Sequence, residues 1–336
     1  RNLQATIFGD MDKLVYTYDI GNKLKKVTDN TSLSYSGHYG FKDGNKSGDD
    51  YTYDANGNML SDANKGISSI TYNHLNLPQT LTVDGNNYIT YIYDASGVKQ
   101  AKYVIRNGLD VTNTSYAGNY IYDVTPSGEA TLQFFNHSEG YIKKDGNTFN
   151  YVYQYKDHLG NVRLSYTDTN KDGVITASTE IIEESNYYPF GLKHKGYNNI
   201  TSSLGNSTAQ KKGFANEELE EELGKNTVAF QWRDYDPALG RFNKIDRFAE
   251  KYFTITPYHF TANNPILYQE IGGDSIGKGR KDYNKFRKEV IQKRQRILNK
   301  RARKLKRAKK KGKTKRVARL TKRYAKEDTD PNSSIN

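Results

Sequence analysis

Tyrosine and threonine alternate in short runs along the first third of the chain. The run Tyr16–Tyr18 returns at Tyr51–Tyr53, Ile70–Tyr72 and Tyr91–Tyr93, and more weakly at Tyr120–Tyr122. A period of two places the aromatic rings on one face of a strand. Asp, Asn and Gly after these runs supply the turn that folds the strand back. We therefore predict a repeated β-hairpin, and because a lone hairpin is marginal in water, successive hairpins pair edge to edge into a long sheet.

A different period governs the last 60 residues. Within residues 282–311 the apolar positions recur at steps of three and four, separated largely by Lys and Arg. These positions are Phe286, Val290, Ile291, Ile297, Leu298, Ala302, Leu305 and Ala308. Such spacing predicts a helix with a narrow apolar stripe. Gly312 predicts its end, and Val317, Leu320 and Tyr324 repeat the spacing in a second, shorter helix, so we expect a helical hairpin.

Composition excludes several kinds of site. Hydrophobic residues make up 35% of the chain, against about 45–50% in ordinary globular domains, so tyrosine must help to fill the core. The absence of Cys excludes disulfides, Cys-ligated metal sites and a thiol nucleophile. The sequence contains no apolar run long enough to span a membrane, no spaced His pair, no Gly-x-Ser-x-Gly elbow and no Gly-rich phosphate loop. No required cofactor and no small-molecule substrate is evident.

Charge divides the chain into two parts. Residues 1–276 carry a net charge of −7, whereas residues 277–336 carry +20. The basic part contains no His, and its five acids are dispersed, so it shows no clustered nuclease-type site. The chain begins at Arg1 without a Met, and we interpret it as a fragment of a longer protein.

Further motifs follow the hairpin repeats in a fixed order. They are Tyr-Lys-Asp-His-Leu-Gly-Asn-Val-Arg at 155–163, Tyr-Tyr-Pro-Phe-Gly-Leu at 187–192, Tyr-Asp-Pro-Ala-Leu-Gly-Arg-Phe at 235–242 and Thr-Pro-Tyr-His-Phe-Thr-Ala-Asn-Asn-Pro at 256–265. Together with the repeats, this series resembles the YD-repeat, or Rhs, proteins of bacteria. The resemblance is to their C-terminal RHS repeat-associated core segment, in the form found among Bacteroidetes-like sequences, and it covers roughly residues 10–276.

The resemblance implies a mainly β fold in which YD-repeat hairpins form a spiralling sheet, a fragment of a hollow shell around a toxic C-terminal domain. On this basis we expect a hairpin wall at residues 1–150, the core or plug segment at 151–276 and a basic helical region at 277–336 that is a linker or a truncated effector. The resemblance further implies a polymorphic toxin of interbacterial competition, secreted or held at the cell surface, whose partners are its own C-terminal effector and an immunity protein.

A rival hypothesis is a cell-surface adhesion or carbohydrate-binding repeat protein, because exposed tyrosine hairpins also stack on sugars. The direction of the tyrosine rows separates the two. Rows that point inward favour a container, and an exposed aromatic strip favours binding. We expect the aromatic run from Trp232 to Phe253 to form the core of the plug, and the acidic run Glu217–Glu222 to be a solvated face or a short helical turn that ends at Gly224.

Many relatives of this type cut themselves near the junction with the toxin, using Asp side chains of two Asp-Pro-x-Gly-like motifs. The matching positions here are Asp246, followed by Arg instead of Pro, and Glu270, which replaces Asp before Ile271-Gly272-Gly273. Peptide hydrolysis by carboxylates needs one acid to activate water and another to donate a proton. Asp246 and Glu270 are thus the candidates for self-cleavage, and the alternative is that both only hydrogen-bond a turn.

Residues 168–176 match the start of a calcium loop. Asp168, Asn170 and Asp172 supply side-chain oxygens, Gly173 allows the bend and Val174 offers a backbone carbonyl. The final carboxylate, Glu180, comes one residue later than the usual position, which weakens the expected site. The alternative is a metal-free hairpin tip rich in turn-forming residues.

The basic region predicts attraction to a polyanion. Nucleic acid, an anionic membrane surface and the acidic inner wall of the shell are the three candidates, and the first would make the region a nucleic-acid-binding effector. We expect the contacts from Arg294, Arg301, Arg303, Lys304, Arg307, Lys310 and Arg316. Few aromatic residues are present there to stack on bases.

Overall fold

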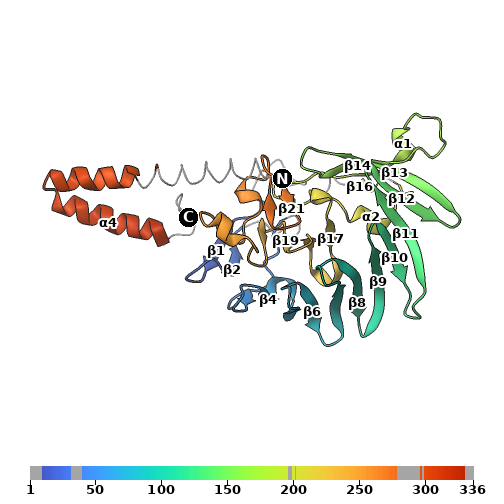
Figure 1. The fold of residues 1–336 in the computed structure, drawn as a ribbon, viewed down its shortest axis with the longest axis horizontal. Helices are drawn as coiled ribbons and strands as arrows, with labels where there is room; N and C mark the ends of the chain where they lie inside the picture. The colour runs from blue at the N-terminus through green and yellow to red at the C-terminus, as the bar shows by residue number, and fades with distance from the viewer. Residues whose placement is uncertain are drawn as a thin grey trace.

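Antiparallel β-hairpins dominate the computed structural model, which describes residues 10–31, 40–195, 199–200, 202–277, 296 and 299–329. Twelve strands form one sheet in sequence order (Figure 1). They are β5 (Ser69–Tyr72), β6 (Pro78–Asp84), β7 (Asn87–Tyr93), β8 (Lys99–Arg106), β9 (Leu109–Ala117), β10 (Tyr120–Val124), β11 (Ala130–His137), β12 (Gly140–Asp145), β13 (Thr148–Lys156), β14 (Val162–Tyr166), β15 (Ile181–Glu184) and β16 (Asn199–Ile200). The expected mainly β fold with a long hairpin sheet is confirmed. The expected boundary at residue 150 falls inside β13.

Smaller sheets surround the large one. They are β1 (Leu14–Tyr18) with β2 (Leu24–Asp29), β3 (Tyr51–Tyr53) with β4 (Met59–Asp62), β21 (Glu270–Ile271) with β22 (Ser275–Ile276), and the four-stranded sheet β17 (Glu218–Glu220), β18 (Thr227–Ala229), β19 (Asp234–Asp236) and β20 (Arg241–Phe242). Two single-turn helices, α1 (Ala177–Glu180) and α2 (Ser207–Gln210), lie beside the large sheet.

A shared turn explains the repeat. In the copies that begin with Asp54, Asp94 and Asp157, the Asp amide donates to the carbonyl four residues later at 2.9–3.0 Å. One Asp carboxylate oxygen accepts the amide of that same later residue at 2.8–3.0 Å. The Gly at the fourth position has a positive φ of 76–85° in all three copies, which favours glycine. Asp and Gly therefore recur because the turn favours a side-chain oxygen at its first position and a positive φ at its fourth, and Asn73 and Asn76 take these two places in the copy after Ile70–Tyr72.

The inner face of the large sheet carries its core. Leu81, Ile89, Tyr91 and Val104 form one buried cluster, and Ile121, Phe134, Tyr141 and Val152 belong to a second. The four-stranded sheet lies against this side and holds a third cluster of aromatic rings. That cluster contains Phe214, Phe230, Tyr235, Phe242 and Phe260. Tyr235 and Phe260 stack with ring centroids 4.1 Å apart, so tyrosine does fill the core.

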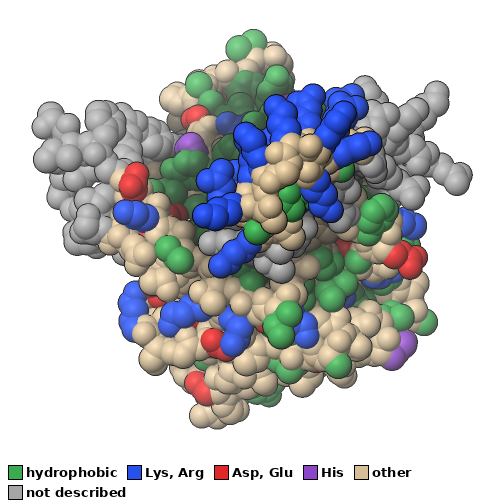
Figure 2. Space-filling view, turned by 90° about the vertical axis from the view of Figure 1, so that its left-hand side faces the viewer, with side chains coloured by type: hydrophobic (Ala, Val, Ile, Leu, Met, Phe, Trp, Pro, Cys, Tyr) green, Lys and Arg blue, Asp and Glu red, His purple; other side chains and the backbone are tan. Residues whose placement is uncertain are grey.

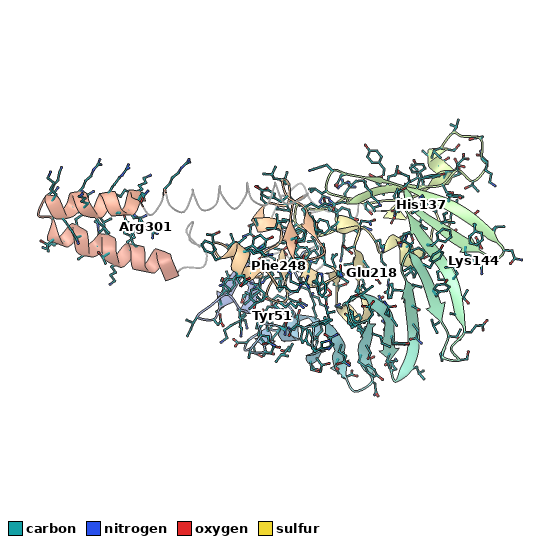
Figure 3. All side chains as sticks on the ribbon, in the orientation of Figure 1. Tyr51, His137, Lys144, Glu218, Phe248 and Arg301 are labelled. Carbon is teal, nitrogen blue, oxygen red and sulfur yellow. The ribbon has the colours of Figure 1, made fainter. Side chains whose placement is uncertain are left out.

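Buried ion pairs join the core segment to the sheet. Lys102 of β8 lies 2.6 Å from Glu218 and 3.0 Å from Glu222. Lys99, also of β8, lies 2.7 Å from Glu220, which further contacts Lys225. Burial opposes ionisation of Glu220, but the three lysines outweigh it and hold its pKa well below the usual value. Figure 3 shows Glu218 between the two layers.

The expectation of a solvated acidic face at residues 217–222 was therefore wrong for Glu218 and Glu220, which are 8% and 0% exposed. They alternate along β17 and meet lysines of β8, so a strand rather than a helical turn places both on the inside. Gly224 does end a single 3-10 turn, Glu222–Gly224.

The C-terminal helices form the expected hairpin. Residues 299–310 are helical, the chain turns at 311–313 with a φ of 62° at Gly312, and α4 (Thr314–Thr329) runs back beside the first helix. Figure 1 shows the hairpin projecting away from the β-rich body. Among the residues that the structure describes, no helix is long and apolar enough to cross a membrane.

Candidate functional site

A fully buried arginine gathers the two carboxylates that the sequence selects. One terminal nitrogen of Arg233 lies 2.8 Å from Asp246 and 3.6 Å from Glu270. These carboxyl groups come from separate elements, the loop after β20 and strand β21. Asp246 and Glu270 are 3% and 5% exposed, and Arg233 is 1% exposed. The two candidate acids are therefore brought to a single guanidinium out of contact with bulk solvent.

Local hydrogen bonds fix both acids. Asp246 accepts the amide of Phe248 at 2.7 Å. Glu270 accepts the amide of Thr261 at 3.2 Å through one oxygen, while its other oxygen has no hydrogen-bond partner among the described atoms. Thr261 opens a left-handed turn of three residues, Thr261–Asn263, with φ of 45–57°. Non-glycine residues in this region carry strain, so the packing around Glu270 must hold the turn in place.

A glycine turn completes the site. Gly272 and Gly273 connect β21 to β22 with φ of 62° and 82°, and the carbonyl of Gly273 accepts a hydrogen bond from Arg233. A Cβ on Gly273 would lie 2.8 Å from the Cβ of Phe230. Only glycine therefore places this peptide against the arginine. The side chain of Arg233 also stacks on Phe242, 3.7 Å from the ring centroid.

Burial raises the pKa of both acids above the usual value of each. It raises the pKa of Glu270 to about 8, against the smaller opposing effect of Arg233. It also raises the pKa of Asp246, again opposed by Arg233. Glu270 therefore holds a proton at neutral pH. A neutral acid and a second carboxyl beside an arginine-bound peptide carbonyl are the groups that carboxylate-catalysed hydrolysis requires.

Two groups of this site are not among the residues that the sequence selects, although one of them, His259, lies inside the motif at residues 256–265. Arg233 is the other, and it stands in the aromatic run next to Asp234, where nothing in the local sequence marks it as buried. His259 lies close to the same acids in the chain, between Asp246 and Glu270. It is buried, accepts the amide of Ala262 at 3.3 Å, and packs its ring 5.2 Å from that of Tyr252. Burial lowers the pKa of His259 to about 3, so the ring is neutral.

A second arginine covers the glycine turn. Arg247 pairs with Asp274 and stacks on Trp232, 3.4 Å from the ring centroid. On the other side, Trp232 and Arg233 line a cavity of about 360 Å³ between the core segment and the large sheet. Of the groups in the candidate site, only Arg233 lines this cavity; Asp246, Glu270 and Gly273 do not.

The predicted calcium loop is held by its own hydrogen bonds. Glu180, 3% exposed, accepts the amides of Thr169 at 2.8 Å and Thr176 at 2.7 Å. Asp168 accepts the amide of Gly173 at 3.0 Å. The remaining predicted ligands, Asn170, Asp172 and Val174, bond to one another at the exposed tip. Among the described residues no group of three or more His, Asp or Glu is placed to hold a metal ion, and calcium binding here stays a prediction.

Most of the predicted polyanion contacts lie on the surface of the C-terminal hairpin. Arg303, Lys304, Arg307, Lys310 and Arg316 are exposed. Arg301 differs, since it is 9% exposed and its guanidinium lies 4.7 Å from the ring centroid of Tyr324. It belongs to the seam between the helices rather than to the exposed surface. Arg294 lies outside the described residues.

Some tyrosine rows face the buried inner side and others face solvent. Tyr91, Tyr141 and Tyr235 are buried on the inner side. On β13 the alternation instead exposes Phe149, Tyr151, Tyr153 and Tyr155, which lie on the face opposite the buried Val152. The rings of Tyr151 and Tyr153 stack 6.3 Å apart. We call these four residues the outer aromatic strip.

Comparison with known proteins gives the fold. No family profile and no curated protein sequence matches the chain. The crystal structure of TcdB2–TccC3 matches 77% of it with a TM-score of 0.54 and 16% identity. The Photorhabdus luminescens Tc holotoxin pore with a mutated TccC3 matches 80% of it, with a TM-score of 0.53 and 18% identity. The chain spans 13% of the length of each of these neighbours. The fold is thus of the Rhs type seen in Tc toxin components.

Proposed function

We propose that the chain is the last part of the shell and the core segment of a toxin-type Rhs protein, which encloses and presents a C-terminal effector outside the producing cell. The observation that carries the proposal is the position of the Arg233 cluster. The core segment is joined to the inner face of the sheet by buried ion pairs, and the cluster lies directly before Gly277, the last residue of the β-rich body that the structure describes. An immunity protein for the effector belongs to the same proposal, as does the Bacteroidetes-like type of the core.

Self-cleavage is the step proposed for this cluster. Asp246, as a carboxylate, takes a proton from a water molecule, whose oxygen forms a bond to the carbonyl carbon of Gly273. Arg233, already bonded to that carbonyl oxygen, stabilises the negative charge that develops on it. Glu270 gives its proton to the nitrogen of Asp274 as the carbon–nitrogen bond breaks. The products are a carboxyl terminus at Gly273 and an amino terminus at Asp274.

Intact mass spectrometry of the purified chain during incubation at pH 7 tests this step. We expect a product pair that corresponds to residues 1–273 and 274–336, and its absence in Asp246→Asn and Glu270→Gln. Glu183→Gln is the matched control, because Glu183 is a buried glutamate bonded to Ser165 on the large sheet. A chain that remains whole, or that is cut equally in both site variants, overturns self-cleavage and leaves a scaffold with a tethered tail.

A second candidate function is carbohydrate binding at the cell surface, favoured by the outer aromatic strip. Exposed aromatic side chains in a contiguous row mark interaction sites. A glycan array with the intact chain tests it. The strip variant is Tyr151→Ser/Tyr155→Ser, and the control is Tyr16→Ser, a change at an exposed tyrosine of β1. Retention of a glycan that only the strip variant loses would support binding. Absence of any bound glycan contradicts it.

A further inference from the structure

The C-terminal hairpin concentrates positive charge over most of its length, and its two acids, Glu327 and Asp328, come at the end of α4. Residues 299–324 contain fifteen Lys and Arg and no Asp or Glu, and fourteen of those fifteen side chains are exposed. Figure 2 shows Lys and Arg gathered around the end of the hairpin. Because the hairpin extends away from the β-rich body, this charge faces outward rather than toward the acidic part of the chain.

Five apolar residues of the hairpin lie in the seam between its helices, whereas Ala302, which was expected in the apolar stripe, is exposed. Leu305 and Ala308 on the first helix, and Val317, Leu320 and Tyr324 on α4, are buried or half-buried. Arg301 continues the same stripe, with its guanidinium over Tyr324. Spacings of three and four residues keep these positions on one face of each helix. The remaining faces of both helices consist largely of Lys and Arg.

We propose that this hairpin binds double-stranded nucleic acid through the phosphate backbone, without regard to base sequence. The proposal is independent of the proposed function and of self-cleavage. Nucleic acid is a better partner than a membrane because a membrane-bound helix needs a free apolar face, and here each apolar face packs against the other helix. Duplexes are better partners than single strands because Tyr324, the only aromatic residue within 299–329, lies under Arg301 and is not available to stack on bases.

The dimensions of the hairpin fit backbone contact. Basic residues three or four positions apart lie about 5–6 Å from one another on a helix surface, and adjacent helices are about 8–10 Å apart. Each helix with its side chains is about 10–12 Å across, so the two side by side are together about 20 Å wide and exceed the major groove of B-form DNA, which is about 12 Å wide. The pair can lie across the groove and direct Lys and Arg to the phosphates on both sides. Such contacts position a protein without reading bases.

Fluorescence anisotropy with the full chain tests the proposal, using labelled 20-base-pair DNA and RNA duplexes of unrelated sequence at 50–200 mM KCl. We expect similar affinity for different sequences. If six or more phosphates are contacted, affinity should fall about a thousandfold or more over this salt range. Single strands of the same length should bind more weakly. The mass of the chain is checked first, so that loss of the tail by cleavage is not mistaken for lack of binding.

A charge variant locates the binding surface. Arg303→Gln/Lys306→Gln/Lys310→Gln removes three exposed charges from one face of the first helix, and Gln keeps a high helix propensity. Arg106→Gln/Lys46→Gln/Lys195→Gln removes the same charges from exposed positions of the β-rich body. We expect the first variant to lose about tenfold or more in affinity and up to about three units in the salt slope, and the second to change little.

Three results would overturn the proposal. One is no retention of either duplex at 50 mM KCl. Another is equal loss of affinity in the two charge variants, which would assign binding to the overall charge. The third is that the full chain binds vesicles of phosphatidylserine and phosphatidylcholine while it leaves duplexes unbound, which would make the membrane the partner.

Discussion

At the scale of single residues, Arg233 decides the character of the candidate site. It contacts two carboxyl groups and one peptide carbonyl at once, yet burial still raises the pKa of Glu270 to about 8. The sequence singles out Asp246 and Glu270 through a motif near the junction. It does not reveal Arg233, because a charge inside an aromatic run looks the same in sequence whether it is buried or exposed.

The raised pKa of Glu270 predicts a pH-dependent stability. A carboxyl that keeps its proton in the folded state stabilises the fold at low pH, and this contribution is lost as the pH rises from about 4.5 to about 8. Glu270→Gln removes this titration. We expect the variant and the original chain to unfold alike near pH 5, and the variant to be more stable at pH 8.5, by on the order of 1 kcal/mol for each pH unit titrated. Urea unfolding at both pH values measures the stability of the two chains. A stability difference between variant and original chain that is the same at pH 5 and at pH 8.5 would contradict the prediction.

At the scale of elements, the turns and strands differ in how far the sequence predicts them. The Asp-x-x-Gly turns are visible because each favours a side-chain oxygen and a residue with positive φ at fixed positions. Strand β17 is hidden because Glu218 and Glu220 are acidic, and their burial depends on lysines of β8, more than a hundred residues earlier, and on Lys225. Local pattern therefore predicts the hairpins but not the ion pairs that join the layers.

Loss of one buried charge should destabilise the contact between core segment and sheet. Lys102→Met leaves Glu218 and Glu222 without their closest shared cation. Removal of one partner from a buried pair costs about 3–5 kcal/mol. Lys144→Met, at a partly exposed position of β12, is the control and should cost less than about 1 kcal/mol. Chemical denaturation compares the two, and a small effect of Lys102→Met would show that water or rearrangement compensates the glutamates.

The glycine turn between β21 and β22 gives a second prediction at this scale. Gly273→Ala combines a positive φ with a Cβ placed 2.8 Å from Phe230, whereas Gly118→Ala has a φ of 63° and open space around the new Cβ. We expect about 1–3 kcal/mol of strain in both and a larger loss for Gly273→Ala. Thermal unfolding of the two variants measures the difference, and equal losses would mean that Phe230 moves aside.

At the scale of the whole molecule, two units follow different physical rules. In the β-rich body, tyrosine fills the core and acids and lysines pair across layers. In the hairpin, one narrow seam supports a surface made almost entirely of positive charge. The change of charge along the sequence predicts this division. It does not predict the outward direction of the hairpin, which depends on how the chain leaves the body.

The hairpin projects away from the body, and its apolar residues pack within its own seam, so the body should not depend on it. We expect the chain truncated after Gly277 to keep the thermal midpoint of the full chain within about 2 °C, since removal of surface charge far from a core changes stability little. The hairpin contributes the α-helical signal, so circular dichroism should lose its helical component while near-ultraviolet signals of the buried tyrosines remain. A midpoint lowered by much more than this would mean that the basic region packs against the body in solution, and the acidic wall would then be its partner.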